Sequence, residues 1–417
     1  MNEFTRNHYV PQWYQYRFIP PARKENKFYY LDLKPETRVS SGGQRYTRKA
    51  LLRWGPPLCF VQDDLYTTQF GSWKSTEIEE KFFGPIDDEG KRAVDFFGNF
   101  EYSGDVNGNL MPLLRYMNLQ KLRTPKGLAH FASLTGSTGK NELLMLMQEL
   151  QRMYCAIWTE CVWSIADASE SETKFIISDH PVTVYNMGCF PGSRYCQGFS
   201  DPDVRMTGTH TLFPLSLDKS LILTNLSWLR DPYGDPLKPR PNPDLFRGAI
   251  MKWTDIQTGR MLSDEEVNEI NFIIKSRAYR YIAAAEKEWL YPEDKFPRGR
   301  WDQLGDGYLL FPDPRTASFG GQFIAGWEDV RSFASDEYGR TPGQPGYRSK
   351  EVDERKWQCF HAFRGEFARV FGPKRRGTCF EIGGRQITQD SDEFHKITLA
   401  YEKQKPKNAH RRKRRRR

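Results

Sequence analysis

Asp179 is the residue whose position in the sequence most strongly suggests chemistry. It follows the apolar segment KFIIS (174–178) and precedes His180-Pro181, and a proline restricts the residue before it to an extended conformation. A carboxylate on a rigid loop at the end of a strand is a common position for a catalytic base or a metal ligand. The same group could instead form an Asx turn or pair with a buried Arg123. Both interpretations fit the residues.

His8 and Arg123 are the residues that could act together with Asp179. Histidine titrates near neutral pH, so His8 could be a general acid or base. A single histidine in the aromatic segment NHYVPQWYQYRF (7–18), which we expect to be a strand, is also typical of a satisfied core group. Arg123 precedes Thr124-Pro125 at a predicted helix end, where it could bind phosphate or carboxylate, or cap helix carbonyls.

Other reaction motifs are weak. GSTGKN (136–141) has no hydroxyl residue after its lysine, so it predicts a turn into a helix rather than a phosphate loop. DDEGK (87–91) has the E-x-K spacing of metal-dependent nucleases, but its helix-like context favours a solvated charge cluster. The seven histidines form no H-x-x-x-H pair and the seven cysteines no C-x-x-C pair. We therefore expect reduced thiols and no metal site, and the sequence names no cofactor.

The elements that position these residues predict an α+β fold. Helical patterns dominate the first half, at STEIEEKFF (75–83) and as one continuous stripe at KNELLMLMQELQRMYCAIW (140–158), after a strand at KFYYLDL (27–33). The second zone is rich in short strands, and it closes with a helix from 263 in which Ser263 and Glu266 have capping-box spacing. The segment 354–371 is compatible with a helix or a strand. We predict an α+β body over 5–285, a C-terminal extension over 290–400 and a disordered basic tail over 403–417.

The charge of the chain is concentrated in that tail. The formal net charge is +9, yet ten residues from Lys403 to Arg417 are Lys or Arg and none is acidic, so the rest of the chain is nearly neutral. Such a tail predicts salt-sensitive binding to a polyanion such as nucleic acid. The sequence has no transmembrane-length apolar run and no secretory leader pattern, so we expect a cytoplasmic protein. The residues expected to bind the polyanion are Arg411, Arg412, Lys413, Arg414, Arg415, Arg416 and Arg417.

Four segments, taken in order, are similar to a known family. They are HYVPQWYQYRF (8–18), LQKLRTPKG (119–127), IISDHPVTVYN (176–186) and LFPLSLDKSLILT (212–224). Over about residues 5–285 this order resembles the family catalogued as domain of unknown function 4238, which has no assigned activity. The chain carries His180 where the family commonly has Asn, and Trp13 where it commonly has Phe. The resemblance adds a set of polar positions as candidates for a polar network: Gln12, Gln120, Ser178 and Asn271.

Two functional hypotheses follow, and the sequence leaves open whether the protein is an enzyme. In the first, the body is a non-catalytic binding or regulatory module that associates with a polyanion through its basic tail. In the second, His8, Arg123 and Asp179 converge in one pocket and cleave a phosphodiester. The two hypotheses differ in one geometric requirement, because only the second needs the three side chains to meet.

Overall fold

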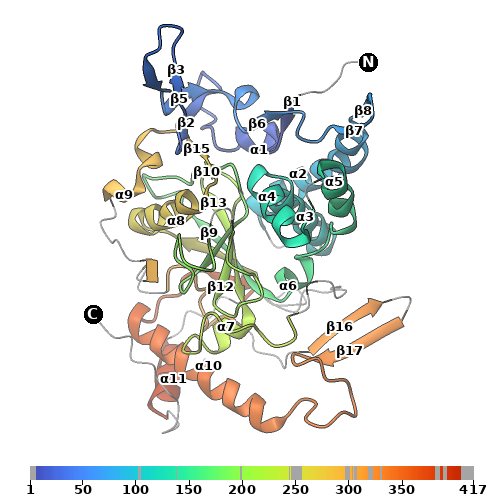
Figure 1. The fold of residues 1–417 in the computed structure, drawn as a ribbon. Coiled ribbons are helices and arrows are strands. Elements are labelled where there is room, and N and C mark those ends of the chain that lie inside the picture. Colours follow the sequence, from blue (N-terminus) through green and yellow to red (C-terminus); the bar gives the residue numbers. More distant parts are fainter. Residues whose placement is uncertain are drawn as a thin grey trace.

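The computed structural model describes most of the chain between residues 6 and 404 (Figure 1). Within that range it leaves out residues 102–104, 138, 198–199, 244, 246–255, 296–300, 303, 305–307, 318–322, 329–330, 381–385 and 388–391. The tail positions predicted to bind a polyanion lie outside the described residues. These are Arg411, Arg412, Lys413, Arg414, Arg415, Arg416 and Arg417.

A seven-stranded sheet forms the centre of the fold, in the order β11-β12-β13-β9-β14-β18-β19. Neighbouring strands are antiparallel except for β9 and β14, which run parallel. The central strands β9 and β13 are almost wholly buried, as their mostly apolar sequences require. The strands are β9 (Cys161–Asp167), β11 (Thr183–Asn186), β12 (Thr209–Pro214), β13 (Lys219–Asn225), β14 (Ile256–Met261), β18 (Thr378–Phe380) and β19 (Gln386–Ile387).

A second, four-stranded antiparallel sheet has the order β10-β15-β2-β5. Its strands are β2 (Phe28–Asp32), β5 (Leu51–Trp54), β10 (Ile177–Ser178) and β15 (Tyr281–Ala284). The segments on either side of the DHP turn, β10 and β11, therefore belong to different sheets. The residues of that turn, Asp179 to Pro181, lie where the chain crosses from one sheet to the other.

Eleven helices and four two-stranded pairings complete the described part of the chain. In Figure 1 the helices α2 to α5 lie on one side of the large sheet and α8 lies on the other. The two-stranded pairings join β1 (Arg6–His8) to β6 (Val61–Asp63), β3 (Thr37–Val39) to β4 (Arg45–Thr47), β7 (Thr68–Phe70) to β8 (Trp73–Ser75), and β16 (Phe323–Glu328) to β17 (Arg331–Asp336). The helices are α1 (Gln12–Tyr16), α2 (Gly84–Gly98), α3 (Val106–Leu122), α4 (Pro125–Thr135), α5 (Lys140–Glu149), α6 (Cys155–Thr159), α7 (Leu226–Arg230), α8 (Asp264–Arg277), α9 (Pro292–Lys295), α10 (Lys350–Phe371) and α11 (Asp392–Lys403).

The predicted α+β class is confirmed. The capping box of α8 is also confirmed: the Ser263 hydroxyl accepts from the Glu266 amide, and the Glu266 carboxylate accepts from the Ser263 amide. The continuous helix predicted over 140–158 is wrong. Its register breaks between α5 and α6 because buried Asn118 donates to the Leu150 carbonyl (3.0 Å) and accepts from the Tyr154 amide (2.9 Å). The undecided segment 354–371 is helical and forms most of α10.

The opening segment NHYVPQWYQYRF also differs from the expected strand. Only Arg6–His8 pairs as a strand, and after Pro11 the chain forms the short helix α1. This helix is anchored in the main core, where the Tyr14 ring stacks on Phe213 of β12 with ring centroids 5.4 Å apart. Because the chain turns between β1 and α1, the first half of the segment pairs with β6 and the second half packs on β12.

The C-terminal extension packs directly on the body. Its strand β18 pairs with β14, so it continues the central sheet. Helix α10 covers α7 through a second apolar cluster, in which Phe360, Phe363 and Phe367 contact Trp228 and Phe311. Within the described ranges, every helix is too short or too polar to cross a lipid bilayer.

Candidate functional site

The corner between α3 and α4, residues 119–127, is the point where the sequence motifs meet. Thr124 is the N-cap of α4 and its hydroxyl accepts from the Gly127 amide (3.1 Å), while Pro125 takes the first helical position. A Cβ atom at Gly127 would lie 2.1 Å from the Lys121 carbonyl oxygen, so only glycine allows the two helices to approach this closely. The T-P-K-G sequence therefore specifies a tight helix-to-helix corner, which we call the α3–α4 corner.

Arg123 is buried at this corner, and its partner is Asp87 of α2 rather than Asp179. The guanidinium forms a bidentate pair with the Asp87 carboxylate (2.9 and 2.7 Å) and donates two further bonds to Gln120 Oε1 (3.0 and 2.7 Å). Burial alone would lower the pKa of Arg123, but the charge and hydrogen bonds of Asp87, together with Tyr66 and Tyr116, raise the pKa of the guanidinium overall. The DDEGK segment is thus not only a solvated cluster, because Asp87 carries the corner's main ion pair.

Gln120 connects the corner to the N-terminal motif. Its Nε2 donates to the Tyr9 carbonyl (2.7 Å), and the Tyr66 hydroxyl donates to the Arg123 carbonyl (3.0 Å). Asn7 is fully buried; its Oδ1 accepts from the Tyr66 amide (3.1 Å) and its Nδ2 donates to Glu79. Asn7 was missed as a candidate although it directly precedes the H-Y-V-P-Q motif.

Asp179 is almost fully buried (2% exposed) and both of its oxygens bind backbone. Oδ1 accepts from the Tyr279 amide (2.8 Å), and Oδ2 accepts from the amides of Arg280 (2.7 Å) and Tyr281 (2.9 Å). Burial raises the pKa of Asp179, and these three N–H groups oppose that rise. The carboxylate thus fixes the turn between α8 and β15.

His8 faces a different neighbourhood from Arg123 and Asp179. It is half-buried on β1, with Nδ1 3.5 Å from Nε2 of Gln12, and burial lowers the pKa of its imidazole. No hydrogen bond or ion pair joins any two of His8, Arg123 and Asp179 in the described part of the chain. The structure therefore does not bring the predicted catalytic trio together through direct contacts.

Ser178 and Asn271, two further predicted positions, bind backbone groups on either side of β10. The Ser178 hydroxyl accepts from the His180 amide (3.2 Å) and shapes the turn after β10. Asn271 of α8 is fully buried, donates to the Lys174 carbonyl (2.9 Å) and accepts from the Ile176 amide (3.1 Å). Both residues hold the SDHP segment against its surroundings, so the predicted polar network is largely a set of backbone contacts.

A charged cluster that sequence reasoning missed lies beside the α3–α4 corner. The Asp201 carboxylate accepts from the ammonium groups of Lys121 (2.6 Å) and Lys126 and contacts His180 Nε2 at 3.1 Å. Lys126 also donates to the Arg277 carbonyl at the end of α8 (2.7 Å). We call Lys121, Lys126, His180 and Asp201 the Asp201 cluster. Lys121 and Lys126 lie within a recognised motif, but no local pattern marks Asp201 as their partner.

The protonation states of the cluster follow from burial and charge. Burial alone would raise the pKa of Asp201, but the two ammonium groups and His180 hold that pKa well below its usual range. Burial lowers the pKa of Lys121, against the opposing effect of Asp201. Burial also lowers the pKa of His180 to about 4, so this imidazole is neutral at neutral pH. The side chains of Lys121 and Lys126 therefore share a single carboxylate beside a neutral imidazole.

Thr124, His180 and Asp201 form a hydroxyl–imidazole–carboxylate chain. The Thr124 Oγ1 lies 2.7 Å from His180 Nδ1 and already accepts from the Gly127 amide. Its hydroxyl therefore donates to Nδ1, and His180 Nε2–H donates to Asp201. A nucleophile and its base occur in this order in hydrolases. Here the threonine is fully buried and caps a helix, so the chain joins the two motifs rather than presenting a nucleophile to solvent.

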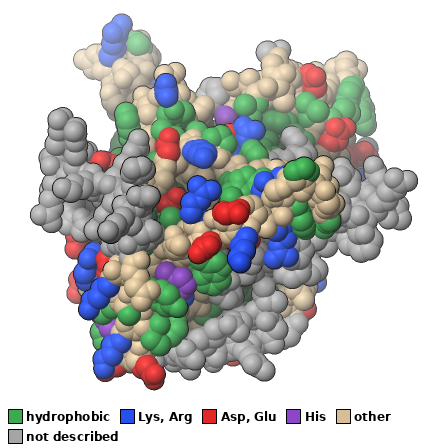
Figure 2. All heavy atoms as spheres, turned by 90° about the horizontal axis from the view of Figure 1, so that it is seen from below, with side chains coloured by type: hydrophobic (Ala, Val, Ile, Leu, Met, Phe, Trp, Pro, Cys, Tyr) green, Lys and Arg blue, Asp and Glu red, His purple; other side chains and the backbone are tan. Residues whose placement is uncertain are grey.

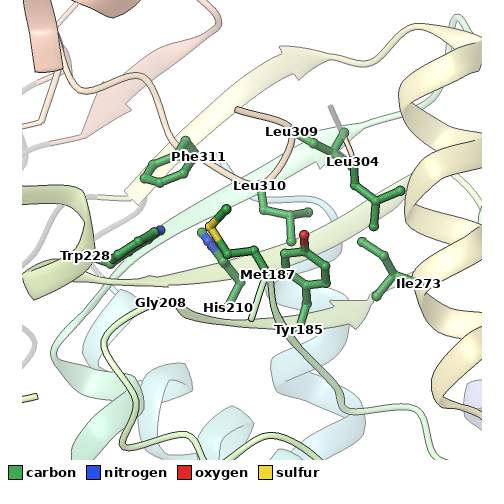
Figure 3. A pocket seen from close by; sticks show the side chains of 10 residues that line it. All are labelled: Tyr185, Met187, Gly208, His210, Trp228, Ile273, Leu304, Leu309, Leu310 and Phe311. Carbon is green, nitrogen blue, oxygen red and sulfur yellow. The ribbon is translucent and has the colours of Figure 1, made fainter. Parts of the chain in front are cut away.

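An apolar pocket lies elsewhere, between the large sheet and residues 304 and 309–311 (Figure 3). Figure 3 shows His210 and Tyr185 facing a lining of Trp228, Leu310 and Phe311. Its free volume of about 20 Å³ holds little more than one water molecule, far below a substrate-sized cavity. Within the described residues, no group of three or more His, Cys, Asp or Glu side chains is placed to hold a metal ion.

Replacing Asp179 by Asn tests its backbone role. The amide keeps the size of the side chain but has only one accepting oxygen, so at least one of the three N–H groups loses its acceptor, at about 1–3 kcal/mol each. We expect Asp179→Asn to lower the free energy of unfolding measured by urea titration. Asp88→Asn, at an exposed position of α2, is the control and should leave stability unchanged. An Asp179→Asn protein as stable as Asp88→Asn would contradict this role.

Asp201→Asn tests the buried ion cluster. The substitution leaves two buried ammonium groups facing a neutral amide, which should cost about 3–5 kcal/mol of unfolding free energy. Asp203→Asn on the same loop is the matched control, because Asp203 pairs with Arg205 at exposed positions (side chains 35% and 47% exposed) and should lose only about 0–1 kcal/mol. Equal losses in the two variants would show that Asp201 is not a structural charge.

His180 should make stability depend on pH. Its pKa is about 4 in the folded protein against the ordinary value of 6.5 in the unfolded chain, so between these values the unfolded chain binds a proton that the folded chain does not. Stability due to this group is complete above pH 6.5 and falls toward pH 4, by up to about 1.4 kcal/mol per pH unit. Unfolding free energies measured from pH 7 to 4.5 should fall less steeply for His180→Asn. Parallel curves for the two proteins would refute this assignment.

Comparison with known proteins identifies the family to which the four sequence motifs point. No curated protein and no solved structure matches the chain. The resemblance inferred from the four motifs is confirmed by a family model described as protein of unknown function (DUF4238), which matches residues 6–288. Since that match covers more than half of the sequence, the chain belongs to the DUF4238 family.

Proposed function

We propose that this protein is a non-catalytic binding or regulatory module that associates with nucleic acid through its basic C-terminal tail. The observation that carries this proposal is the separation of charge along the chain. Ten Lys and Arg residues are concentrated between Lys403 and Arg417, while the remaining residues are nearly neutral. A segment of this composition binds phosphates by releasing counterions and reads no base sequence.

The way the chain enters the tail supports this proposal. Helix α11 packs on α10, where the His361 and Tyr401 rings stack with centroids 4.1 Å apart and Arg369 pairs with Glu402 (3.0 Å). At the end of α11, Lys403 and Gln404 are exposed. The tail is therefore joined to an anchored helix at a position open to a large partner.

The surface of the folded part supports assigning the cationic role to the tail. Figure 2 views the molecule from below the orientation of Figure 1, and on the described part of this face Lys and Arg side chains are interspersed with Asp and Glu. A duplex-binding surface is expected to show one sign of charge over a continuous area. The tail has no aromatic residue after Tyr401, so we expect phosphate contacts without base stacking.

The alternative, a phosphodiester-cleaving hydrolase that uses His8, Arg123 and Asp179, has less support. The Arg123 guanidinium is occupied by Asp87 and Gln120, and both Asp179 oxygens are used by backbone amides. A catalytic arrangement would need these groups within reach of one scissile bond. We therefore prefer the binding hypothesis.

Binding measured by fluorescence anisotropy tests the proposal. Labelled single-stranded RNA and duplex DNA are titrated with the full chain and with a truncation after Gln404, which keeps α11 intact. If six to ten tail charges contact phosphates, the affinity of the full chain should fall about 10³- to 10⁵-fold between 50 and 200 mM salt. The truncated chain should bind weakly at every salt concentration.

A control at a second basic segment distinguishes the tail from general basicity. A variant with Arg45, Arg48 and Lys49 replaced by Gln loses three exposed cations at and next to β4 and should bind as the wild type does. Equal affinity of the full and truncated chains would overturn the proposal. Cleavage of the labelled strands by the full chain, lost in Asp179→Asn while folding is retained, would favour the hydrolase instead.

A further inference from the structure

Cys189 and Cys196 come together on the connection between β11 and β12. Successive turns reverse the chain, with amide-to-carbonyl bonds from Cys189 to Asn186 (3.0 Å), Ser193 to Phe190 (3.0 Å) and Cys196 to Ser193 (2.9 Å). The Cys196 thiol consequently lies 3.7 Å from the Cys189 carbonyl oxygen. Both residues are buried, and Cys196 keeps a slight exposure of 6% while Cys189 has none.

Charged groups around the two thiols make them chemically unequal. Arg277 at the end of α8 donates to the Cys189 carbonyl and stacks over the Trp301 ring at 4.8 Å. Interaction with the Cys189 thiol, helped by Arg277 and opposed by burial, lowers the pKa of Cys196 to about 6. The same thiol contact, together with burial and nearby Asp203, raises the pKa of Cys189. One sulfur is thus suited to be a thiolate and the other to remain a thiol.

Burial has the dominant effect at two other cysteines, Cys155 and Cys359. Burial raises the pKa of Cys155 to about 12 and that of Cys359 to about 11. The thiolate is the reactive form of cysteine. At these two thiols burial outweighs the nearby arginines, Arg152 and Arg115 at Cys155 and Arg355 at Cys359, and the thiol form is favoured. Cys196 combines slight exposure with a neighbouring guanidinium and a second thiol, which is the arrangement of a reactive cysteine beside a resolving one.

We propose that Cys189 and Cys196 are a redox-active dithiol that closes to an intramolecular disulfide when a peroxide oxidises Cys196. The Cys196 thiolate attacks one peroxide oxygen, the O–O bond breaks, and the released hydroxide takes a proton to leave as water. This step oxidises the sulfur by two electrons to a sulfenic acid. Cys189 then attacks that sulfur, an S–S bond replaces the S–OH bond, and the hydroxide leaves as a second water with the Cys189 proton.

The dithiol is in contact with the α3–α4 corner through one residue. The Arg277 side chain donates to the Cys189 carbonyl, and the Arg277 carbonyl accepts from Lys126 of the Asp201 cluster (2.7 Å). Closing the disulfide removes a negative charge beside this guanidinium. The proposed modification therefore acts at a contact of the Asp201 cluster and not on an isolated loop.

Peptide mapping of the native full-length protein tests this proposal. The protein is treated with hydrogen peroxide at neutral pH, and free thiols are then alkylated in acid before trypsin digestion. Cleavage after Lys174, Arg194 and Arg205 places the two cysteines in separate peptides, 175–194 and 195–205. We expect these peptides to become disulfide-linked after oxidation and to separate on reduction.

Serine variants and a second cysteine pair provide the controls. Cys189→Ser should leave a sulfenic acid at Cys196 that a 1,3-dione reagent traps, and Cys196→Ser should leave Cys189 reduced. Cys155 and Cys161 are also buried and six residues apart, so they are the matched pair and should remain thiols. The proposal is overturned if no linked peptide forms in the wild type, or if the control pair is oxidised at the same rate.

Discussion

The close approach of α3 and α4 at Gly127 is the constraint on which the centre of this fold depends. With no side chain at that position, the helices turn sharply enough to place Arg123 against α2 and the Thr124 hydroxyl against His180. A bulkier residue would collide with the carbonyl groups that end α3, which are backbone and cannot move aside. At this corner Gln120 binds the Tyr9 carbonyl of the N-terminal motif, and the Thr124 hydroxyl binds His180 of the loop that crosses between the sheets.

The arrangement explains why polar residues in apolar settings recur along the chain. Each of Gln120, Asp179 and Asn271 satisfies backbone groups at or just beyond the end of a helix or strand. Buried N–H and C=O groups need partners, and a junction of helix ends and a sheet crossing supplies few of its own. These polar side chains thus supply hydrogen-bond partners to buried backbone groups, which is an architectural role.

Features that depend only on residues close together in the sequence, such as helix caps, could be predicted from it. The α8 capping box could be found because Ser263 and Glu266 are three residues apart, and Thr124-Pro125 could be placed at a helix boundary for a similar reason. The break between α5 and α6 could not, because the residue that causes it, Asn118, lies on another helix. The sequence offered Asp179 as one possible partner of Arg123, but the structure pairs Arg123 with Asp87, since spacing along the chain does not report which helix packs against which. Asp201 was missed for the same reason, because its two lysine partners, Lys121 and Lys126, are 80 and 75 residues away in the sequence.

The pairing of β18 with β14 has a consequence for the body that precedes it. The family match ends at residue 288, yet the central sheet of this chain continues into β18 (378–380) and β19 (386–387). Without β18, the open side of β14 would offer a row of free amide and carbonyl groups, which is a template for pairing with a strand of another molecule. In this chain β18 therefore covers the sheet edge at β14, and a truncation after residue 288 would leave that edge open for pairing with another molecule.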